Sequence, residues 1–593
     1  MERVADYIIR KVNEAGAGHI FMITGRGILY LTDAVAKNED ITPVCTFHEQ
    51  GASYAAMAYS AAKEGISACL VSTGCASTNA VTAALCAYQD NLPMVFISGN
   101  NPLNENTRHT GCKIRTYGSQ EADIISIVEP VTKYSVMLED PSRTVYEIEK
   151  ALFMAQDGRK GPVWIDVPLD VQNMRIEEGE FEHFSKLEKK VEDIDSKIKI
   201  ISRLLNEAER PVILMGGGSR EGKVQIGQLA EDFNIPVVCS PAASDIYGTS
   251  HEMSIGTVGS LGGSRAGNFA IQNSDFVLCL GSKLCSQLTG ARDKFARAAK
   301  IIVVDIDENE HTKDGVKIDY LINCLVTEFM DMLLDTGLKV HDRDWADKCI
   351  RWKKVFAIEN EEFVKECRED GSIELYSLLD ELGKVLPEEA TVITDAGFEE
   401  LIVPSAIAYR DGQRALFPAA QGAMGYAIPA IIGAYTAGRK NIVCIVGDGS
   451  IMMNIQELQV ISNMKIPVKI LVINNDMYAV IRKRQKDLFR KRIVGVDPGT
   501  GVSEPEFKKI AECFGFGYKR IKNREELEGW LPGFECNSPE IVEIMSSPDQ
   551  KYFHESYALN ENRKLVHRPI EDMSPFLPRE LVKSEMVIEM PEE

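Results

Sequence analysis

The sequence has no long apolar run and no excess of positive charge. No hydrophobic stretch reaches the length that a bilayer-spanning helix needs. The first residues, 1–6, include acidic side chains and no apolar signal core. The formal net charge of −22 disfavours nucleic acid and anionic membranes as partners. These absences predict a cytoplasmic protein with no nucleic-acid partner and no membrane partner.

The sequence also lacks the cysteine spacing of zinc sites and disulfide frameworks. Fourteen cysteines are present, but none forms a Cys-x-x-Cys pair. The closest are Cys69/Cys75 and Cys279/Cys285, and several, such as Cys444, lie inside apolar runs. We therefore expect buried, reduced thiols.

With 593 residues, the chain is too long for a single hydrophobic core. Its 45% hydrophobic and 26% charged residues are typical of a globular protein. Three segments alternate short apolar runs with helical stretches, the pattern of parallel sheets covered by helices. The predicted fold class is therefore α/β, with three doubly wound parallel-sheet domains and a C-terminal tail. The expected limits are 1–185, 190–340 and 365–550 for the domains and 551–593 for the tail.

The strongest local signal lies in the third segment. A predicted strand, 442–446, is followed by Gly447-Asp448-Gly449-Ser450 and a helix expected over 451–463. The next predicted strand, 468–473, ends at Asn474-Asn475. A right-handed strand–helix–strand crossover brings both strand ends to one edge of the sheet. Asp448 and Asn475 are therefore expected to be neighbours.

Such a strand edge has a specific chemistry. Glycines let the backbone approach a diphosphate, and a helix N-terminus favours its negative charge. A carboxylate and an amide oxygen suit Mg²⁺, which prefers oxygen ligands and shares them with phosphates. A lone Gly-Asp-Gly is often only a turn, but the following helix, strand and paired asparagines favour a magnesium-diphosphate site.

The segment from Gly447 to Asn475 resembles the thiamine-diphosphate motif of transketolases, decarboxylases and acetolactate synthases. The resemblance implies that Asp448, the Asn475 side chain and the Met477 carbonyl hold Mg²⁺. It implies a large apolar residue, here Met453, under the cofactor, although plain core packing also explains this residue. The implied cofactor-binding residues of this motif are Gly447, Asp448, Gly449, Ser450, Met453 and Asn475.

The first segment is similar to the large catalytic subunit of acetolactate synthase. The similarity is carried by His48-Glu49-Gln50-Gly51-Ala52, by 72–79 (Ser-Thr-Gly-Cys-Ala-Ser-Thr-Asn) and by 90–95 (Asp-Asn-Leu-Pro-Met-Val). It implies that Glu49 hydrogen-bonds the cofactor's aminopyrimidine and activates it. In isolation, Glu49 is better explained as a helix-starting acid, but the accompanying motifs of the segment favour the functional interpretation.

Further positions follow from the same resemblance. Gln120 is expected to line the substrate side, and backbone groups of Gly422 and Met424 are expected to hold the aminopyrimidine. The family assembles each site from two chains, which implies a homodimer or homotetramer.

The sequence departs from the family at three places. Cys75 stands beside the cofactor where proline is usual. The loop 395–400 replaces a loop whose glutamine and histidine bind diphosphate, so only the Gly397 backbone is carried over. Because acids near a diphosphate are costly, Phe398 and Glu399 are expected to point elsewhere. Arg484 replaces a substrate-selecting tryptophan, which makes Arg484 and Ile481 candidate substrate residues and an anionic acceptor a possibility.

The predicted function is thiamine-diphosphate- and Mg²⁺-dependent decarboxylation of a pyruvate-like 2-oxo acid with carboligation to an acceptor carbonyl. One alternative is a decarboxylase, C–C lyase or hydrolase that does not ligate. Another is a silent regulatory paralogue, which the joint presence of Glu49, Asp448 and Asn475 disfavours. In the middle segment, the loop 216–218 and the pair Asp305 and Asp307 suit a dinucleotide, so FAD remains open.

Overall fold

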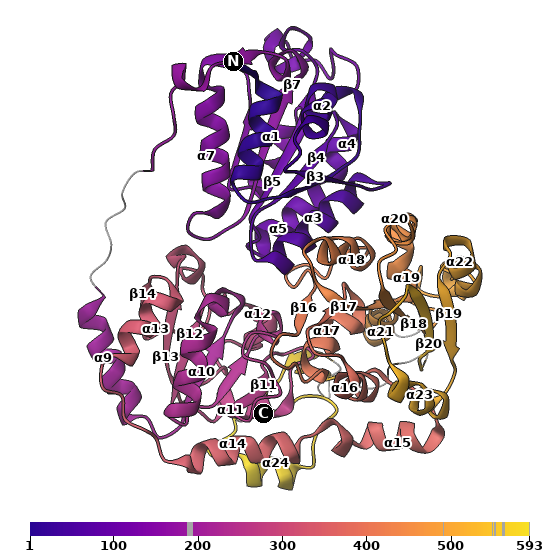
Figure 1. The fold of residues 1–593 in the computed structure, drawn as a ribbon. Helices are drawn as coiled ribbons and strands as arrows, with labels where there is room; N and C mark the ends of the chain where they lie inside the picture. The colour runs from indigo at the N-terminus through magenta and orange to yellow at the C-terminus, as the bar shows by residue number, and fades with distance from the viewer. Residues whose placement is uncertain (187–193, 490–491, 548–549, 551–552, 560–563, 592–593) are drawn as a thin grey trace.

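The computed structural model describes residues 1–186, 194–489, 492–547, 550, 553–559 and 564–591. The chain forms three lobes, each built on one six-stranded sheet (Figure 1). Every pair of neighbouring strands in these three sheets is parallel. The α/β fold class with three wrapped parallel sheets is therefore confirmed.

The first sheet has the order β3-β2-β4-β5-β7-β6. Its strands are β2 (His19–Met22), β3 (Thr42–Cys45), β4 (Ser67–Val71), β5 (Met94–Asn100), β6 (Tyr134–Met137) and β7 (Pro162–Pro168). The helices of this lobe are α1 (Val4–Glu14), α2 (Leu29–Lys37), α3 (Glu49–Lys63), α4 (Cys75–Asn79), α5 (Val81–Gln89), α6 (Ile124–Val128), α7 (Thr144–Gln156) and α8 (Leu169–Gln172). The short strands β1 (Glu2–Arg3) and β8 (Arg175–Ile176) pair antiparallel beside it.

The second sheet has the order β11-β10-β9-β12-β13-β14. Its strands are β9 (Pro211–Met215), β10 (Val237–Cys239), β11 (Ser254–Thr257), β12 (Phe276–Leu280), β13 (Lys300–Asp305) and β14 (Tyr320–Asn323). Its helices are α9 (Asp195–Glu207), α10 (Lys223–Asp232), α11 (Arg265–Gln272), α12 (Ser286–Thr289), α13 (Val326–Leu334) and α14 (Arg343–Val355). Numbered along the chain, this order is 3-2-1-4-5-6, the arrangement of dinucleotide-binding folds.

The third sheet has the order β16-β15-β17-β18-β20-β19. Its strands are β15 (Ala390–Ile393), β16 (Arg414–Leu416), β17 (Lys440–Gly447), β18 (Val468–Asn474), β19 (Gly517–Ile521) and β20 (Glu540–Met545). Its helices are α15 (Glu362–Asp370), α16 (Leu375–Val385), α17 (Gly397–Ala406), α18 (Ala427–Thr436), α19 (Asp448–Ile451), α20 (Leu458–Asn463), α21 (Ala479–Phe489), α22 (Phe507–Phe514) and α23 (Arg524–Trp530).

The first and third sheets share one topology. Numbered along the chain within each sheet, both have the strand order 2-1-3-4-6-5. In both, the third strand is followed by a short helix, α4 after β4 and α19 after β17. The two lobes are therefore structural repeats, a relation that the sequence alone does not show.

The expected helix over 451–463 is wrong in detail. The helix begins earlier, at Asp448, and is divided into α19, the 3₁₀ segment η11 (Met452–Glu457) and α20. The interruption falls at Asn454, whose backbone is non-helical at φ −133°. Its side-chain amide donates to the Gly425 carbonyl (2.8 Å) and to Gln50 Oε1 (3.0 Å). These tertiary bonds replace the regular helical turn there.

The outer lobes pack together through α3 and α18 (Figure 1). Gly433 in α18 lies so close to the Ala55 carbonyl of α3 that a Cβ at position 433 would overlap it. Buried side chains from both lobes, among them Tyr54, Met57, Ile428 and Ile431, form one continuous core. The start of α3 is thereby fixed beside the third sheet. The strands of the three sheets fall within 1–185, 190–340 and 365–550, and we retain these limits as proposed domain boundaries.

The tail lies across the second and third lobes. A hairpin of β21 (Tyr557–Leu559) and β22 (Leu565–His567) precedes α24 (Arg579–Glu585). Glu555 forms isolated antiparallel bridges with Leu261 and Ser574. The tail therefore links the central lobe to the edge of the third lobe.

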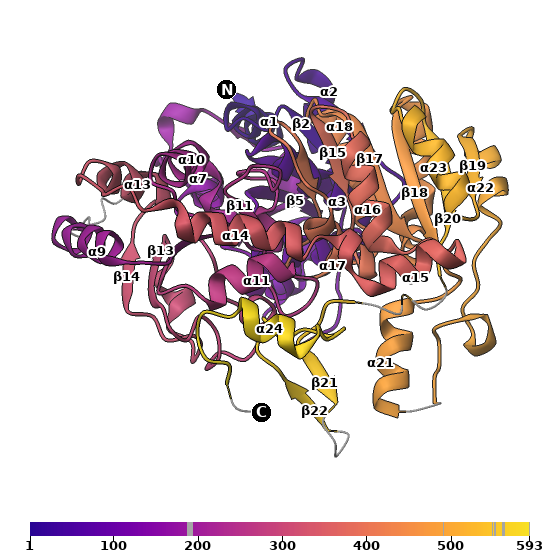
Figure 2. The same ribbon diagram turned by 90° about the horizontal axis from the view of Figure 1, so that it is seen from below.

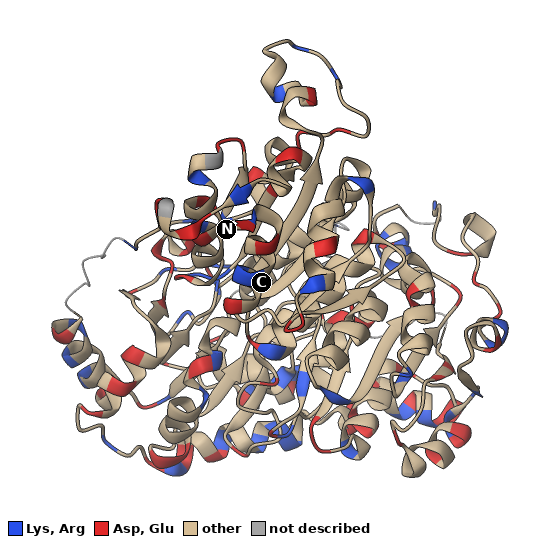
Figure 3. Ribbon diagram, turned by 45° about the horizontal axis from the view of Figure 1, so that its top comes forward, with Lys and Arg blue, Asp and Glu red and all other residues tan. Residues whose placement is uncertain are grey.

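Acidic and basic residue positions are interspersed along the ribbon of the outer helices in Figure 3. Among the described residues, no helix is both long and apolar enough to cross a membrane. Within the described part of the chain, no cysteine forms a disulfide. Burial raises the pKa of the thiols of Cys69, Cys279 and Cys444, as expected for buried thiols. The same expectation is wrong for the five exposed cysteines, which are Cys45, Cys75, Cys112, Cys285 and Cys513.

Candidate active site

Asp448 and Asn475 meet at the carboxyl edge of the third sheet, as predicted. Asp448 Oδ2 accepts hydrogen bonds from the backbone N–H groups of Asn475 (2.9 Å) and Asp476 (2.7 Å). Asn475 Oδ1 is buried and has no hydrogen-bond partner. A buried, unpartnered oxygen beside a carboxylate is the donor set that a hard divalent cation would complete. Burial raises the pKa of Asp448 to about 6.

The glycines of this loop serve different purposes. A Cβ at Gly449 would overlap the ring of Tyr478, so this glycine is required by ring packing. A Cβ at Gly447 would meet nothing closer than Glu399 Oε1, at 3.5 Å. The expectation that the glycines make room for a diphosphate therefore stays open for Gly447, whereas the structure gives Gly449 another reason.

Asp395 joins two loops of the candidate site. Its Oδ2 accepts from the Gly425 N–H (3.0 Å) and the Ser450 hydroxyl (2.6 Å), while its buried Oδ1 has no partner. Burial raises the pKa of Asp395 to about 6. This carboxyl fixes the turn that carries Gly422 and Met424 against the Gly-Asp-Gly loop.

The loop 395–400 corrects one expectation. Phe398 points away from the site and packs on Phe553, with ring centroids 5.3 Å apart, as expected. Glu399 does not point away: its Oε2 lies 2.6 Å from where a Cβ of Gly397 would stand, and its Oε1 faces Gly447. Its side chain turns inward because Phe398 on the preceding position fills the apolar core instead.

Glu400 also faces the site. Its carboxyl covers Gly422, where a Cβ would overlap Glu400 Oε2. Burial, with smaller contributions from neighbouring acids, raises the pKa of both Glu399 and Glu400 to about 8. At neutral pH both groups are mostly protonated and neutral, so each offers an O–H donor and adds little negative charge.

A further acid reaches the site from a distant loop. Glu504 has a buried, unpartnered Oε2, and its pKa is raised to about 7, chiefly by burial and also by the charges of Asp448 and Asp476. The sequence offered no local signal for Glu504, because this residue lies in a loop beyond α21 and belongs to no recognisable motif.

Other expected cofactor residues lie around these groups. Met453 is 50% exposed, and its Cβ lies 2.8 Å from where a Cβ of Gly425 would stand, so it is not a core residue. Met424 and Gly422 are half-buried, and Gly422 has a positive φ of 55°. Met477 donates its backbone N–H to the Asp448 carboxyl. No described contact tests its carbonyl as a metal ligand.

Glu49 is the first residue of α3. Its Oε2 accepts a hydrogen bond from Asn79 Nδ2 at 3.0 Å. The cap of α3 is supplied by the preceding residue, because His48 Nδ1 accepts from the Gln50 N–H at 3.0 Å. Glu49 is therefore not needed as the cap, which leaves its carboxylate available for chemistry.

Glu457 is an acid that the sequence did not single out. It is fully buried and accepts the backbone N–H groups of Phe47 (3.2 Å) and His48 (3.0 Å). Burial raises its pKa. Glu457 thus positions the start of α3, including Glu49, against η11.

Cys75 and Gln120 lie near each other in the first lobe. Cys75 is exposed at the start of α4. The Gln120 carbonyl packs so closely on Gly74 that a Cβ there would overlap it. Gln120 has a positive φ of 60° and lines a cleft with Thr73.

The structure places Arg484 and Ile481 on α21, which projects from the body beside the hairpin of the tail (Figure 2). Ile481 is 51% exposed. The Arg484 guanidinium lies 3.4 Å from Glu555 Oε2 and over the ring of Tyr557, 5.5 Å from its centroid. Lys483 also pairs with Glu555, at 2.7 Å. The tail therefore supplies the acid that partly neutralises the positive charge of this helix.

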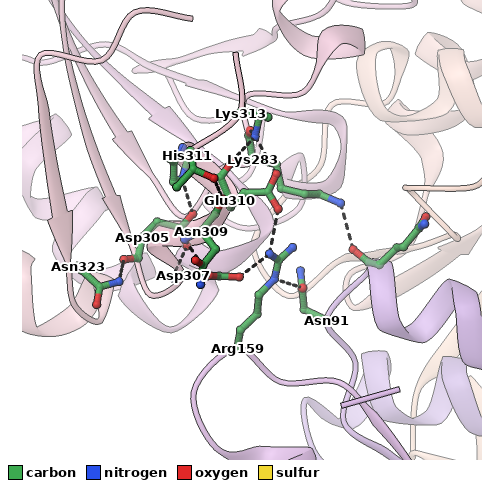
Figure 4. A network of polar contacts seen from close by, with 12 residues as sticks. Asn91, Arg159, Lys283, Asp305, Asp307, Asn309, Glu310, His311, Lys313 and Asn323 are labelled. Atoms are coloured by element: carbon green, nitrogen blue, oxygen red, sulfur yellow. Dashed lines mark hydrogen bonds and ion pairs between the residues drawn. The ribbon is translucent and has the colours of Figure 1, made fainter. Parts of the chain in front are cut away.

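In the central lobe, the glycine and the two aspartates that would suit a dinucleotide are engaged in contacts within the protein. A Cβ at Gly216 would overlap the Gly281 carbonyl, so close backbone packing requires this glycine. Asp305 pairs with His311 (3.2 Å), and Asp307 pairs with Arg159 of the first lobe (2.9 Å) (Figure 4). The network ties the central lobe to the first lobe, and none of these contacts favours a flavin.

The chain has family-level matches along all three lobes. Residues 2–127 match the model "Thiamine pyrophosphate enzyme, N-terminal TPP binding domain", 198–333 the central domain and 395–543 the C-terminal TPP binding domain of the same enzymes. The chain belongs to the thiamine-pyrophosphate-dependent enzymes. It is accordingly an enzyme of the decarboxylase and carboligase kind that uses this cofactor. None of the three model descriptions names a flavin.

Named relatives cover nearly the full length of this thiamine-pyrophosphate enzyme. The acetolactate synthase large subunit of Lactococcus lactis is 28% identical over 553 residues, 92% of each chain. The acetolactate synthase isozyme 1 large subunit of Escherichia coli is 27% identical over 560 residues, 93% of this chain and 95% of its own. A probable acetolactate synthase large subunit of Methanocaldococcus jannaschii is 29% identical over 568 residues, 92% of each.

Proposed function

We propose that the enzyme decarboxylates a pyruvate-like 2-oxo acid and joins the remaining fragment to an acceptor carbonyl, with thiamine diphosphate and Mg²⁺. The observation that carries this proposal is that the Asp448 carboxylate, which accepts from the Asn475 N–H, lies at the same strand edge as the buried, unpartnered Asn475 Oδ1. Two oxygen donors of this kind fit Mg²⁺. The relatives named acetolactate synthase support the carboligation.

The residues present fit the cofactor under one condition. Asp448, Asn475 and the Met477 carbonyl would hold the metal, and the loops around Gly397, Gly422 and Gly447 would surround the cofactor. The inward carboxyls of Glu399 and Glu400 are compatible with a diphosphate while they stay protonated, which their raised pKa values near 8 favour at neutral pH. As neutral acids they would donate hydrogen bonds to phosphate oxygens.

When bound, thiamine diphosphate supplies the nucleophilic carbon and the electron sink for decarboxylation. Glu49 would hold the proton that the aminopyrimidine of the cofactor exchanges. The amide of Asn79 fixes the orientation of the Glu49 carboxylate (3.0 Å). Gln120 would line the substrate side. Cys75 begins α4, the short helix that ends at Asn79, the partner of Glu49, and Met453 presents an exposed apolar side chain. Ile481 and Arg484 on α21 border the path of the acceptor.

We further propose that the functional unit is a homodimer or a tetramer of such dimers. Four large apolar side chains are exposed around the start of α3, the end of α5 and η11: Phe47 (62%), Tyr88 (41%), Met452 (40%) and Met453 (50%). Phe47 lies beside η11, because the Phe47 N–H bonds to Glu457 at the end of that segment. Clusters of exposed apolar groups are typical of subunit interfaces.

The decisive experiment supplies magnesium, thiamine diphosphate and pyruvate, with and without acceptor aldehydes and 2-oxo acids. Release of CO₂ together with a ligated product, identified by mass spectrometry, supports the proposal. CO₂ with only the free aldehyde would favour a non-ligating decarboxylase. Turnover of a 1,2-diketone without CO₂ would indicate a lyase or hydrolase, and cofactor binding without turnover of any substrate would indicate a silent regulatory paralogue.

A further inference from the structure

The carboxyl edge of the central sheet is the edge at which dinucleotide-type folds bind their ligands, between the first strand and the fourth. In this chain those strands are β9 and β12, which are neighbours in the sheet. The loops that follow them touch: the Gly218 N–H donates to the Gly281 carbonyl (3.0 Å), and a Cβ at Gly281 would overlap the Gly218 backbone. A backbone N–H that would face a pyrophosphate is therefore engaged by the protein.

The same edge of the central sheet holds the end of α5 from the first lobe. Lys283 follows β12, and its Nζ donates to the carbonyl of Gln89, the last residue of α5 (3.0 Å). The Lys283 carbonyl accepts in turn from Lys313 Nζ (2.6 Å), which fixes the loop that carries the lysine. The carbonyls at a helix C-terminus carry partial negative charge, so an ammonium group stabilises them. The central lobe therefore caps a helix of the first lobe.

A second contact holds the residues 89–91 that end α5 (the α5 turn). Asn91 lies in the left-handed region at φ 59°, as is common just after a helix. Its Oδ1 accepts from Arg159 Nε (2.6 Å). The Arg159 guanidinium also pairs with Asp307 and Glu310 of the central lobe, at 2.9 Å each (Figure 4). The α5 turn is thus fixed to the central lobe at both of its ends.

The α5 turn also contacts the loop 418–425 of the third lobe (the ring loop). The Ala420 N–H donates to Asp90 Oδ1 (3.0 Å). Beside this bond, Gln421 Nε2 donates to Gln89 Oε1 (2.6 Å). The three lobes therefore meet at three consecutive residues of the first lobe.

Asp90 is a costly residue for a turn that only packs. Burial raises its pKa to about 7, although the charge of Lys283 and the N–H groups of the ring loop act to lower it. Its Oδ2 is buried and has no hydrogen-bond partner in the described ranges of the chain. A buried carboxyl with one unsatisfied oxygen is less favourable than an apolar side chain in the same place. What this carboxyl provides is an acceptor for the backbone of the ring loop.

We propose that Asp90 is a positioning residue for the ring loop, and that the central lobe holds, through Lys283 and Arg159, the turn from which Asp90 acts. The carboxyl edge of the central sheet is then a contact for the first lobe and takes no dinucleotide. The inference rests on the proposed role of Gly422 and Met424, two residues of the ring loop, in holding the aminopyrimidine.

Hydrogen–deuterium exchange of the cofactor-free protein, followed by mass spectrometry, reads the ring loop without any turnover. Asp90→Ala should raise the exchange rate in the ring loop by about tenfold or more, because the Ala420 N–H loses its acceptor. Lys283→Met should raise it by about threefold or more, although Lys283 Nζ bonds to Gln89 and not to the ring loop. Asp90→Asn should restore most of the protection, because its amide keeps an acceptor oxygen.

Calorimetric binding of thiamine diphosphate with Mg²⁺ gives the second readout. The dissociation constant should rise by about five- to thirtyfold in Asp90→Ala and by about three- to tenfold in Lys283→Met, but by less than about twofold in Asp90→Asn. Asp40→Ala, at an exposed acid of the first lobe, and Lys300→Met, at the exposed first residue of β13, are the matched controls. Both should bind the cofactor as wild type does.

The outcomes that overturn the inference are specific. Unchanged exchange and affinity in Asp90→Ala would remove the positioning role, and a loss in Asp90→Ala without any effect of Lys283→Met would remove the role of the central lobe. Saturable binding of FAD to wild type at micromolar concentration would show that this edge does take a dinucleotide. If Asp90→Ala does not fold, the loss expected in Lys283→Met and the near-normal binding expected in Asp90→Asn decide.

The proposed function is tested separately. Wild type that binds thiamine diphosphate with Mg²⁺ but releases no CO₂ from pyruvate or from other 2-oxo acids would overturn the proposed function. The exchange and binding comparisons need no turnover, so they would still decide the role of Asp90.

Discussion

The first and third sheets share the strand order 2-1-3-4-6-5 but carry opposite chemistry at the same edge. After the third strand, the first lobe has the neutral turn 72–75, with the cation of Arg26 beside it. At the equivalent place the third lobe has Asp448, with Glu399 nearby. One topology therefore provides two binding edges, and their side chains decide which ligands each accepts.

The acids of the third lobe show how strong this difference is. Burial raises the pKa of Asp395 and Asp448 to about 6 and of Glu399 to about 8. Such a cluster is costly unless a cation or protons neutralise it. In the first lobe the charged group at this edge, Arg26, is exposed to solvent and carries no such cost. A metal-bound cofactor would neutralise the acids of the third-lobe edge.

The largest effect is expected from Asp448→Ala, which removes the anionic ligand from the third-lobe edge. We expect thiamine-diphosphate affinity in the presence of Mg²⁺ to fall by about a hundredfold or more and activity to fall to background. Calorimetry and circular dichroism would measure binding and fold. Asp411→Ala, an exposed acid of the same lobe, should bind normally. Undiminished Mg²⁺-dependent binding by Asp448→Ala would show that the metal is held elsewhere.

Glu49→Gln tests the first-lobe side of the comparison. The amide keeps the shape of the side chain but cannot hold the exchanging proton, so turnover should fall by about a hundredfold or more. Cofactor affinity should change far less, because the binding groups lie on the other edge. Exchange of the cofactor C2 proton into deuterated water, followed by NMR, measures the step directly. Exchange and turnover at the wild-type rate would return Glu49 to the role of a helix-starting acid.

Glu399→Gln sharpens the comparison through stability. The folded protein holds a proton on Glu399 up to about pH 8, whereas the unfolded chain loses it near pH 4.5. Rising pH therefore destabilises the folded wild type across this window, and glutamine does not titrate. In cofactor-free protein the variant should gain on the order of 5 kcal/mol at pH 9 and roughly nothing at pH 4, because each unit of pKa shift is worth about 1.4 kcal/mol.

Urea unfolding at pH 4, 7 and 9 measures this gain. Glu388→Gln, an exposed glutamate of the same lobe, should show no such trend. A gain for Glu399→Gln that is equal at all three pH values would mean that the carboxyl is already ionised in the folded protein.

The parts of the site that follow from strand ends were predictable from the sequence. Asp448 and Asn475 each follow a buried parallel strand, and the crossover rule alone places them together. Strand limits agreed closely for the same reason: Phe276–Leu280 was predicted and found, and the strand expected at 442–446 is Lys440–Gly447. Apolar runs bounded by polar turns determine such elements locally.

Groups positioned by distant loops were not predictable. Asn454 breaks its helix because of bonds to Gln50 and Gly425, which no local pattern contains. Glu399 turns inward because Phe398 takes the core position. The residues around this pair do not reveal which of the two adjacent side chains faces the core.

The smallest effect is expected from Arg484→Ala, which tests whether a cation helps to bind the acceptor. Arg484 lies 3.4 Å from Glu555 and shares this acid with Lys483, so part of its charge is already neutralised. Its loss should lower the yield of ligated product per CO₂ by about three- to tenfold for an anionic acceptor. Product and CO₂ are measured together with pyruvate as donor and with glyceraldehyde 3-phosphate and glyceraldehyde as matched anionic and neutral acceptors. Lys486→Ala, on the same helix, is the matched control.

Because Glu555 holds Arg484 to the tail, Glu555→Gln should act in the opposite direction by freeing the guanidinium. Equal product yields in wild type, Arg484→Ala and Glu555→Gln would show that Arg484 does not help to bind the acceptor.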